Sequence, residues 1–97
     1  MSSRTSEARI EAWLNARIRE MGGLSYKFVS PGNLGVPDRI YILPGGSVWF
    51  VELKAETGRL AKLQMWQGRR LQAAGCNYRV IKGMDEAKAF VDELQGR

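Results

Sequence analysis

The chain has 97 residues, enough for one compact core, and no segment that reads as a secretory signal or a membrane span, so we expect a single cytoplasmic domain covering residues 1–97. Its formal charge of +5 and its pI near 9.8 favour a nucleic-acid binder over an enzyme of small neutral metabolites. One cysteine and no histidine exclude an internal disulfide, a cysteine-ligated zinc site and histidine-based catalysis, which leaves carboxylates, lysine, hydroxyls and oxygen-preferring metals such as Mg²⁺.

The first predicted element is a helix that Ser6 caps and that Gly22-Gly23 ends. Its apolar residues recur with helical spacing at Ile10, Trp13, Leu14, Ile18 and Met21. A short strand over 24–29 follows. Residues 30–37 are rich in proline, glycine and asparagine, which predicts a loop whose backbone can approach a ligand closely.

Two further strands, 39–43 and 47–54, flank a Pro44-Gly45-Gly46 hairpin turn. From Thr57-Gly58 the period changes to that of a helix ending at Gly75, with an apolar face formed by Leu60, Leu63, Leu71 and Ala74. A fourth strand covers 77–82, and Asp85 is expected to cap a last helix that carries Ala87, Phe90, Val91 and Leu94. The order α-β-β-β-α-β-α predicts an α/β fold in which helices cover the faces of a mixed sheet.

The hairpin turn determines which residue faces Glu52. Antiparallel pairing keeps the sum of paired residue numbers constant, so a three-residue loop over 44–46 that pairs Leu43 with Ser47 also places Asp38 opposite Glu52. A five-residue loop gives the same register, whereas a loop of two or four residues would shift it by one. In the expected register the Cβ atoms of the two acids lie ~4.5–5.5 Å apart.

Lys54 projects from the same face as Glu52, two residues further along the strand. Facing carboxylates repel each other unless a cation lies between them, and Mg²⁺ binds carboxylate oxygens while it keeps places for water or phosphate. A nearby lysine can orient or deprotonate the attacking water. Glu52-x-Lys54 alone could be a solvated surface pair, but Pro37-Asp38 after a glycine-rich loop favours a metal-dependent phosphodiesterase site.

Four motifs resemble the VRR-NUC family of the PD-(D/E)xK nuclease superfamily: Lys27 to Arg39 with its Pro37-Asp38, Leu43-Pro44-Gly45-Gly46, Phe50 to Ala55 with its Glu52-Leu53-Lys54, and Gly58 to Gln64. The likeness runs from the first helix to the fourth strand, which is nearly the whole chain. It implies a restriction-endonuclease-like core and DNA cleavage that depends on Mg²⁺, with Mn²⁺ able to substitute.

The resemblance also implies roles for individual residues. Asp38 and Glu52 match the acids that bind the metal in the family, and the Leu53 backbone carbonyl matches a further metal ligand. Lys54 matches the catalytic lysine, and Gln64 matches a residue that orients the site. The family places a glutamate on the first helix. Glu7 lies closer to the inward face than Glu11, so Glu7 is the expected acid, acting on the metal directly or through water, and the choice between the two stays open.

Gln64 and Gln67 both fall on the inward face of the second predicted helix. If they are buried there, a carboxylate or a water of the metal site would be their hydrogen-bond partner. The alternative is that they lie at the edge of this face and reach solvent. Trp66 falls off that face and is expected to be exposed, as a dimer contact or a DNA stacker, with partial burial under a neighbouring element as the alternative. The residues expected to contact DNA are Lys27, Ser30, Arg39, Arg59 and Lys62.

A homodimer is the natural way for so small a surface to contact two DNA strands. The resemblance to stand-alone family members implies branched DNA such as Holliday junctions as substrate, and a phage or prophage source. The alternative function is a catalytically silent DNA-binding or protein-interaction module of the same fold. A small-molecule phosphohydrolase is disfavoured by the net charge of +5 and by the absence of a phosphate-cradling helix motif.

Overall fold

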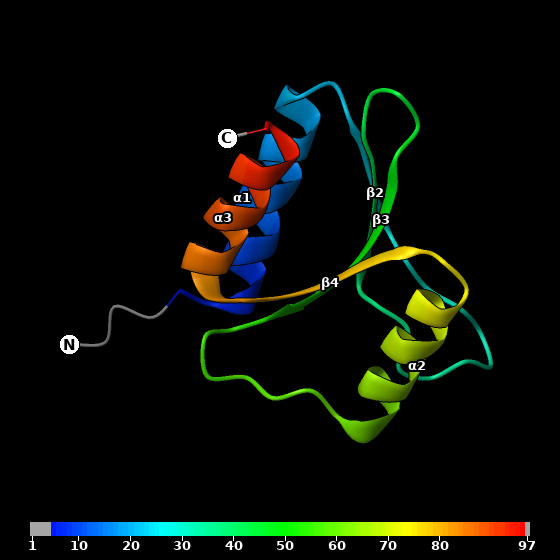
Figure 1. The fold of residues 1–97 in the computed structure, drawn as a ribbon. Coiled ribbons are helices and arrows are strands. Elements are labelled where there is room, and N and C mark those ends of the chain that lie inside the picture. Colours follow the sequence, from blue (N-terminus) through cyan, green and yellow to red (C-terminus); the bar gives the residue numbers. More distant parts are fainter. Residues whose placement is uncertain (1–4, 97) are drawn as a thin grey trace.

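The computed structural model describes residues 5–96, and its elements follow in the predicted order (Figure 1). They are α1 (Glu7–Glu20), β1 (Leu24–Lys27), β2 (Arg39–Ile42), β3 (Val48–Lys54), α2 (Lys62–Ala73), β4 (Asn77–Lys82) and α3 (Gly83–Leu94). The strands form one mixed sheet of order β1-β2-β3-β4, in which only β3 and β4 are parallel. Helices α1 and α3 lie side by side against one face, and α2 stands apart from them on the other side of the sheet (Figure 1).

Helix α1 begins and ends as predicted. The Ser6 hydroxyl accepts a hydrogen bond from the Arg9 backbone N–H at 3.2 Å, which satisfies one of the free donors of the first turn. The helix buries Ile10, Leu14 and Ile18, which recur on one face with helical spacing.

Alternation along the strands divides the sheet into a core face and a second face. Odd-numbered residues of β2, β3 and β4 point toward α1 and α3, and Tyr41, Val51, Leu53 and Ile81 are buried there. Helix α3 adds Ala87, Phe90 and Val91 to this core. The even-numbered residues therefore face the side where α2 packs, and Glu52 is one of them.

The predicted register of the hairpin is confirmed. Strand β2 pairs with β3 from Arg39 opposite Val51 to Ile42 opposite Val48, and the Leu43 N–H donates to the Ser47 carbonyl at 2.8 Å. The observed strand ends differ slightly from the predicted ones, since β1 ends at Lys27, β2 ends at Ile42 and β3 begins at Val48.

The prediction for α2 was wrong in two respects. The helix begins at Lys62 and not at Thr57-Gly58, and Leu63, which was expected on its inward face, is 43% exposed. The buried residues are Gln67 and Gly68. A Cβ at position 68 would lie 2.5 Å from the Tyr78 ring, so the helix packs closely on β4 through a position without a side chain.

Helix α3 begins at Gly83, two residues before the predicted cap Asp85. The Lys82 N–H donates to the Glu86 carboxylate at 2.8 Å, so Glu86 satisfies the donor at the start of the helix. Asp85 lies in the first turn, where the helix dipole favours a carboxylate. Within residues 5–96 no helix combines the length and the apolar character that crossing a membrane requires.

Candidate active site

Asp38 faces β3 at the point where β2 begins. Continuing the observed register by one pair places it opposite Glu52, as predicted. Its Oδ2 accepts a hydrogen bond from the Leu53 N–H at 2.8 Å, and its own backbone carbonyl accepts one from Phe28 at 2.9 Å. Asp38 is therefore held by both neighbouring strands.

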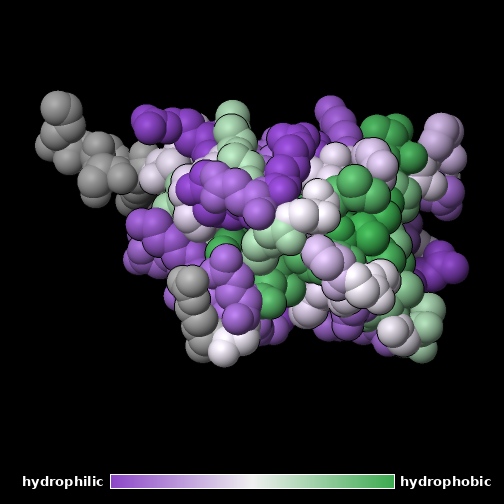
Figure 2. Space-filling model, turned by 90° about the horizontal axis from the view of Figure 1, so that it is seen from above, coloured by the Kyte–Doolittle hydropathy of each residue, from purple (hydrophilic) through white to green (hydrophobic). Residues whose placement is uncertain are grey.

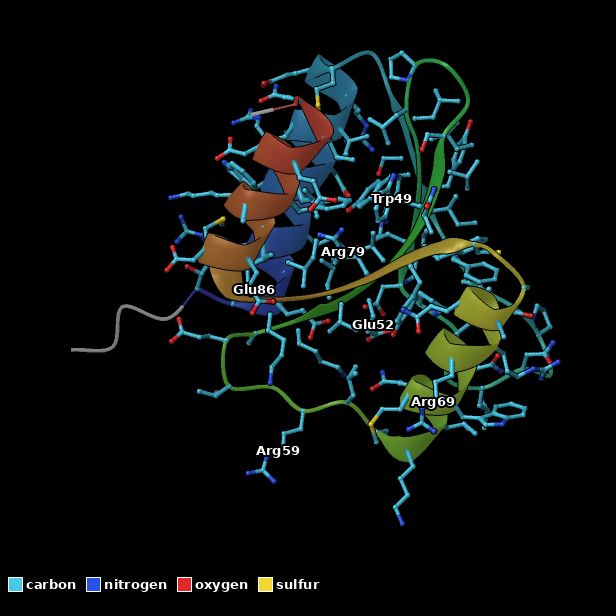
Figure 3. All side chains as sticks on the ribbon, in the orientation of Figure 1. Trp49, Glu52, Arg59, Arg69, Arg79 and Glu86 are labelled. Atoms are coloured by element: carbon cyan, nitrogen blue, oxygen red, sulfur yellow. The ribbon has the colours of Figure 1, made fainter. Side chains whose placement is uncertain are left out.

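The two carboxylate oxygens of Glu52 have different surroundings. Oε2 accepts a hydrogen bond from Gln64 Nε2 at 3.1 Å and lies 3.7 Å from Lys54 Nζ. Oε1 is buried and receives no hydrogen bond from a donor among the described residues, and the residue as a whole is only 1% exposed. In Figure 3, Glu52 lies between the sheet and α2. A buried carboxylate oxygen without a donor is unfavourable unless a cation or another ligand meets it.

The electrostatics of the site resist ionisation of Glu52. Burial, followed by repulsion from the Asp38 carboxylate, raises the pKa of Glu52 to about 8, and the positive charge of Lys54 opposes this only in part. The pKa of Glu7 is also raised, first by burial and then by Asp38, while Lys54 lowers it. Glu7 is thus within electrostatic reach of the same acids, and a cation among them would relieve their repulsion.

The register of the hairpin leaves the Leu53 carbonyl without a ladder donor from the β2 side. Hydrogen-bonded pairs alternate along an antiparallel ladder, and Leu43–Ser47 at the turn is one of them, so Pro37–Leu53 would be another in this register. Proline has no N–H. The Leu53 carbonyl is therefore free of a ladder bond on the side where Asp38 lies.

These groups fit a divalent cation of the Mg²⁺ type. The carboxylates of Asp38 and Glu52 and the Leu53 carbonyl are all oxygen donors, and the partnerless Glu52 Oε1 is the atom most in need of a cation. No cluster of three histidine, cysteine, aspartate or glutamate side chains in the described part of the chain would hold a metal ion. A cation here would therefore rely on two acids, the backbone oxygen and water or phosphate, as Mg²⁺ commonly does.

The structure separates the two glutamates of α1. Glu11 accepts a hydrogen bond from Arg39 Nη1 at 3.1 Å, whereas the charges of Asp38 and Lys54 shift the pKa of Glu7 in opposite directions. The prediction that Arg39 contacts DNA was wrong. Its side chain is buried against Glu11 and donates to Ser25 Oγ at 2.6 Å. Glu11 is committed to that buried arginine, which leaves Glu7 as the α1 acid beside the site.

The remaining residues predicted to contact DNA lie at the surface. Lys27, Arg59 and Lys62 are exposed and Ser30 is partly exposed, and Figure 3 shows Arg59 pointing away from the body of the molecule. Trp66 is 47% exposed, as expected, with the Arg70 guanidinium 4.6 Å from its ring centre.

The two glutamines of α2 have different partners. Gln64 meets Glu52, as expected for a glutamine on the inward stripe, and its Oε1 also accepts the Ala61 N–H at 2.9 Å. The partner expected for Gln67 was wrong, since its Nε2 donates to the Leu34 carbonyl at 3.1 Å and not to an acid. Gln67 therefore holds the glycine-rich loop against α2.

Tyr78 is a residue beside the site that the sequence reasoning missed. Burial raises its pKa, and the charges of Glu52 and Asp38 raise it further. It pairs with Phe50 in the parallel register of β3 and β4, so it shares the second face of the sheet with Glu52. Tyr78 has an even residue number in a strand that was predicted from the sequence, and even-numbered residues share the face of Glu52. This alternation could have located it.

The comparisons with known proteins agree with this geometry. No family model matches the chain. The protein named "Putative nuclease p44" of Acyrthosiphon pisum secondary endosymbiont phage 1 is 43% identical over 79 residues, which cover 81% of this chain and 85% of that protein. A solved structure described as "VRR_NUC domain" has a TM-score of 0.84 and 29% identity, and the match covers 91% of this chain and 96% of the other.

Proposed function

Because this chain belongs to the VRR-NUC family, we propose that it is a divalent-metal-dependent endonuclease that hydrolyses phosphodiester bonds of DNA. The observation that carries the proposal is the Glu52 carboxylate, buried with one oxygen partnerless and with Asp38 facing it. Lys54 lies 3.7 Å from the other oxygen of the same carboxylate. A metal-dependent hydrolysis of phosphate esters uses this set of groups.

The residues that would hold the cation are Asp38, Glu52 and the Leu53 carbonyl, and Glu7 would act on it through water. Mg²⁺, with Mn²⁺ able to substitute, would supply positive charge against the phosphate oxygens and would acidify an attacking water. Lys54 orients or deprotonates that water, or neutralises charge that develops on the phosphate. Gln64 fixes the orientation of the Glu52 carboxylate through its 3.1 Å hydrogen bond. Water would attack phosphorus directly, without a covalent enzyme intermediate, as the bond from phosphorus to one sugar oxygen breaks and that oxygen leaves as a hydroxyl.

The DNA contacts that we propose come from Lys27, Ser30, Arg59 and Lys62, which lie at the surface and are supported by the net charge of +5. These residues would bind the phosphate backbone and carry no sequence information by themselves. The phage relative supports the cytoplasm of an infected cell as the place where the enzyme acts.

A homodimer is the form that we propose for the active enzyme, and an uncovered sheet face supports it. Part of the second face is not covered by α2, so that Leu24, Tyr26 and Val48 are 50%, 53% and 37% exposed. Apolar side chains also gather on one side of the molecule in Figure 2. The even-numbered residues of β1, β2 and the start of β3 are Leu24, Tyr26, Ile40, Ile42, Val48 and Phe50. None of them is charged, so two copies of this basic protein could meet there without burying like charges.

Two sites in one dimer could cut two strands, which is why branched DNA such as a four-way junction is the substrate that we propose. Sedimentation measures the oligomeric state, and Tyr26→Lys should shift the protein toward a monomer by placing a charge in the interface. A wild-type protein that remains monomeric at high concentration would contradict the dimer.

The test of the nuclease proposal compares the wild type with Lys54→Ala on linear, flapped and four-way DNA, in Mg²⁺ and in EDTA. We expect cleavage that requires Mg²⁺ and that falls by about 10²-fold or more in the variant, a magnitude typical of losing one charge-stabilising group. Lys88→Ala removes the same charge from an exposed position of α3 and is the matched control. Equal cleavage by wild type and Lys54→Ala would refute the proposal, and so would DNA binding without any metal-dependent product.

A further inference from the structure

A cavity of about 300 Å³ lies between α2 and the segment that joins β1 to Asp38, and we call it the α2 cavity. Its lining residues are Phe28, Ser30, Asn33, Val36, Gln67, Arg70, Leu71 and Ala74. This volume is at the lower end of small-molecule sites, which span ~300–1,000 Å³. The cavity therefore has room for one small planar group.

The cavity is close to the catalytic acids along α2. Gln64 reaches Glu52, and Gln67, Leu71 and Ala74 follow it on the same side of the helix. At about 1.5 Å of rise per residue, Leu71 lies roughly 10 Å beyond Gln64 along the helix axis. A DNA strand with its scissile phosphate at Glu52 would thus place a neighbouring nucleotide at the cavity.

The walls combine an aromatic ring with hydrogen-bond acceptors. Phe28 supplies the ring, which packs against Phe50 with 5.6 Å between ring centres. One N–H of the Gln67 amide donates to the Leu34 carbonyl, and its Oε1 remains an acceptor that no donor from residues 5–96 reaches. Asn33 similarly donates its amide nitrogen to Ser30 Oγ at 3.0 Å and keeps its Oδ1. Arg70, stacked 4.6 Å from the Trp66 ring centre, adds a cation to the lining.

We propose that the α2 cavity binds one unstacked nucleobase of the DNA substrate, close to the scissile phosphate. This inference rests on the proposed nuclease function and deepens it. Phe28 stacks on the base, Gln67 and Asn33 accept from its exocyclic amino group, and Arg70 pairs with an adjacent phosphate. Adenine, cytosine and guanine carry such an amino group and thymine does not, so the cavity discriminates against thymine.

A base inside a duplex cannot reach this cavity without leaving the stack, and extrusion costs least where the base is already unpaired. The α2 cavity therefore gives the enzyme a preference for branched or single-stranded DNA over continuous duplex. This preference originates in one chain and does not require the second copy of a dimer.

The experiment fills the cavity from its rim. Ala74 lines the cavity and is exposed, and the adjacent Ala73 is exposed and does not line it, so Ala74→Trp and Ala73→Trp add the same side chain at matched positions. Both changes are made in the Lys54→Ala background so that binding is measured without cleavage. The probe is a branched DNA with one unpaired 2-aminopurine, an amino-bearing fluorescent base, and an intact duplex is the reference.

We expect Ala74→Trp to weaken binding of the branched probe by roughly 5- to 100-fold, the range for the loss of one stacked base, and to abolish the change in 2-aminopurine fluorescence. Affinity for intact duplex should remain within twofold, and Ala73→Trp should behave as the parent. Asn33→Ala, at an exposed position, should reduce the discrimination between adenine and thymine at the unpaired base.

Equal affinity of Ala74→Trp and Ala73→Trp for the branched probe would overturn the inference, as would unchanged fluorescence when the parent protein binds. The two hypotheses fail separately. Metal-dependent cleavage without an effect of Ala74→Trp refutes the base cavity alone, and cavity-dependent binding without cleavage by the wild type refutes the nuclease alone.

Discussion

The metal-free protein should lose stability as the pH rises, and Glu52→Gln should remove this dependence. The pKa of Glu52 is raised from 4.5 to about 8 by burial and by Asp38. Between these two values the folded protein holds a proton that the unfolded chain has released. A folded state that binds the extra proton becomes less stable as the pH rises, and the loss is complete only above the pKa of about 8.

The magnitude follows from proton linkage. One proton corresponds to ~1.4 kcal/mol of unfolding free energy per pH unit, so the wild type should lose about 2 kcal/mol between pH 6 and pH 8. The chain contains no histidine, so no imidazole titrates in this interval. Other groups that titrate there contribute equally to the wild type and to Glu52→Gln, and the difference between the two proteins isolates Glu52.

The assay is urea unfolding at pH 6, 7 and 8 in EDTA, followed by tryptophan fluorescence, since Trp49 packs against the core residue Phe90. Wild-type stability relative to Glu52→Gln should fall by about 2 kcal/mol over this range. Saturating Mg²⁺ should restore the wild type, because a ligand of the folded state alone stabilises it, and should do little for the variant. Parallel pH profiles of the two proteins in EDTA would refute the reasoning.

Two other sets of variants test the assignments around the site. Glu7→Gln should reduce Mg²⁺-dependent cleavage with little change in stability, whereas Glu11→Gln should lower the unfolding free energy by about 1–3 kcal/mol because the buried Arg39 loses its carboxylate partner. The opposite pattern in cleavage and urea-unfolding assays would reassign the α1 acid to Glu11. Gly68→Ala should destabilise the protein by about 1–3 kcal/mol, because the new Cβ would lie 2.5 Å from the Tyr78 ring. Thermal unfolding at the wild-type temperature would mean that α2 does not pack on β4 as described.

The sequence predicts the element order and the hairpin register because both depend on local features. Hydrophobic periodicity locates the helices and strands, and Gly45 and Gly46 take φ angles of +95° and +90°, which glycine adopts without strain. The three-residue turn then determines the pairing of β2 with β3. The close packing of α2 on β4 could not be predicted in this way, because the contact is made at Gly68, which has no side chain, whereas periodicity detects apolar side chains.

In the candidate site too, the features that depend on local sequence could be predicted and those that depend on tertiary contacts could not. The sequence brings Asp38, Glu52 and Lys54 together through register and alternation, and helical geometry favours Glu7 over Glu11. It could not show that Arg39 is buried, because the partner Glu11 lies 28 positions away in the chain and meets the arginine only in the folded protein. Tertiary contacts of this length leave no local pattern in a single sequence.

The pair Pro37-Asp38 has a physical meaning beyond the identity of the acid. Just before β2 begins, the next hydrogen-bonded ladder position is Pro37, which should exchange two hydrogen bonds with Leu53 but has no N–H to donate. The Asp38 carboxylate accepts the Leu53 N–H at 2.8 Å, so the donor of Leu53 is satisfied by a side chain while its carbonyl is left without a ladder donor. Asp38 thereby contacts the backbone N–H of the residue whose carbonyl lacks a ladder donor, and Glu52 immediately precedes that residue on the same strand. Interrupting the β2–β3 ladder at a proline thus leaves the Leu53 carbonyl without a ladder donor beside the facing pair Asp38 and Glu52, and carboxylate and carbonyl oxygens are the ligands that a hard cation prefers.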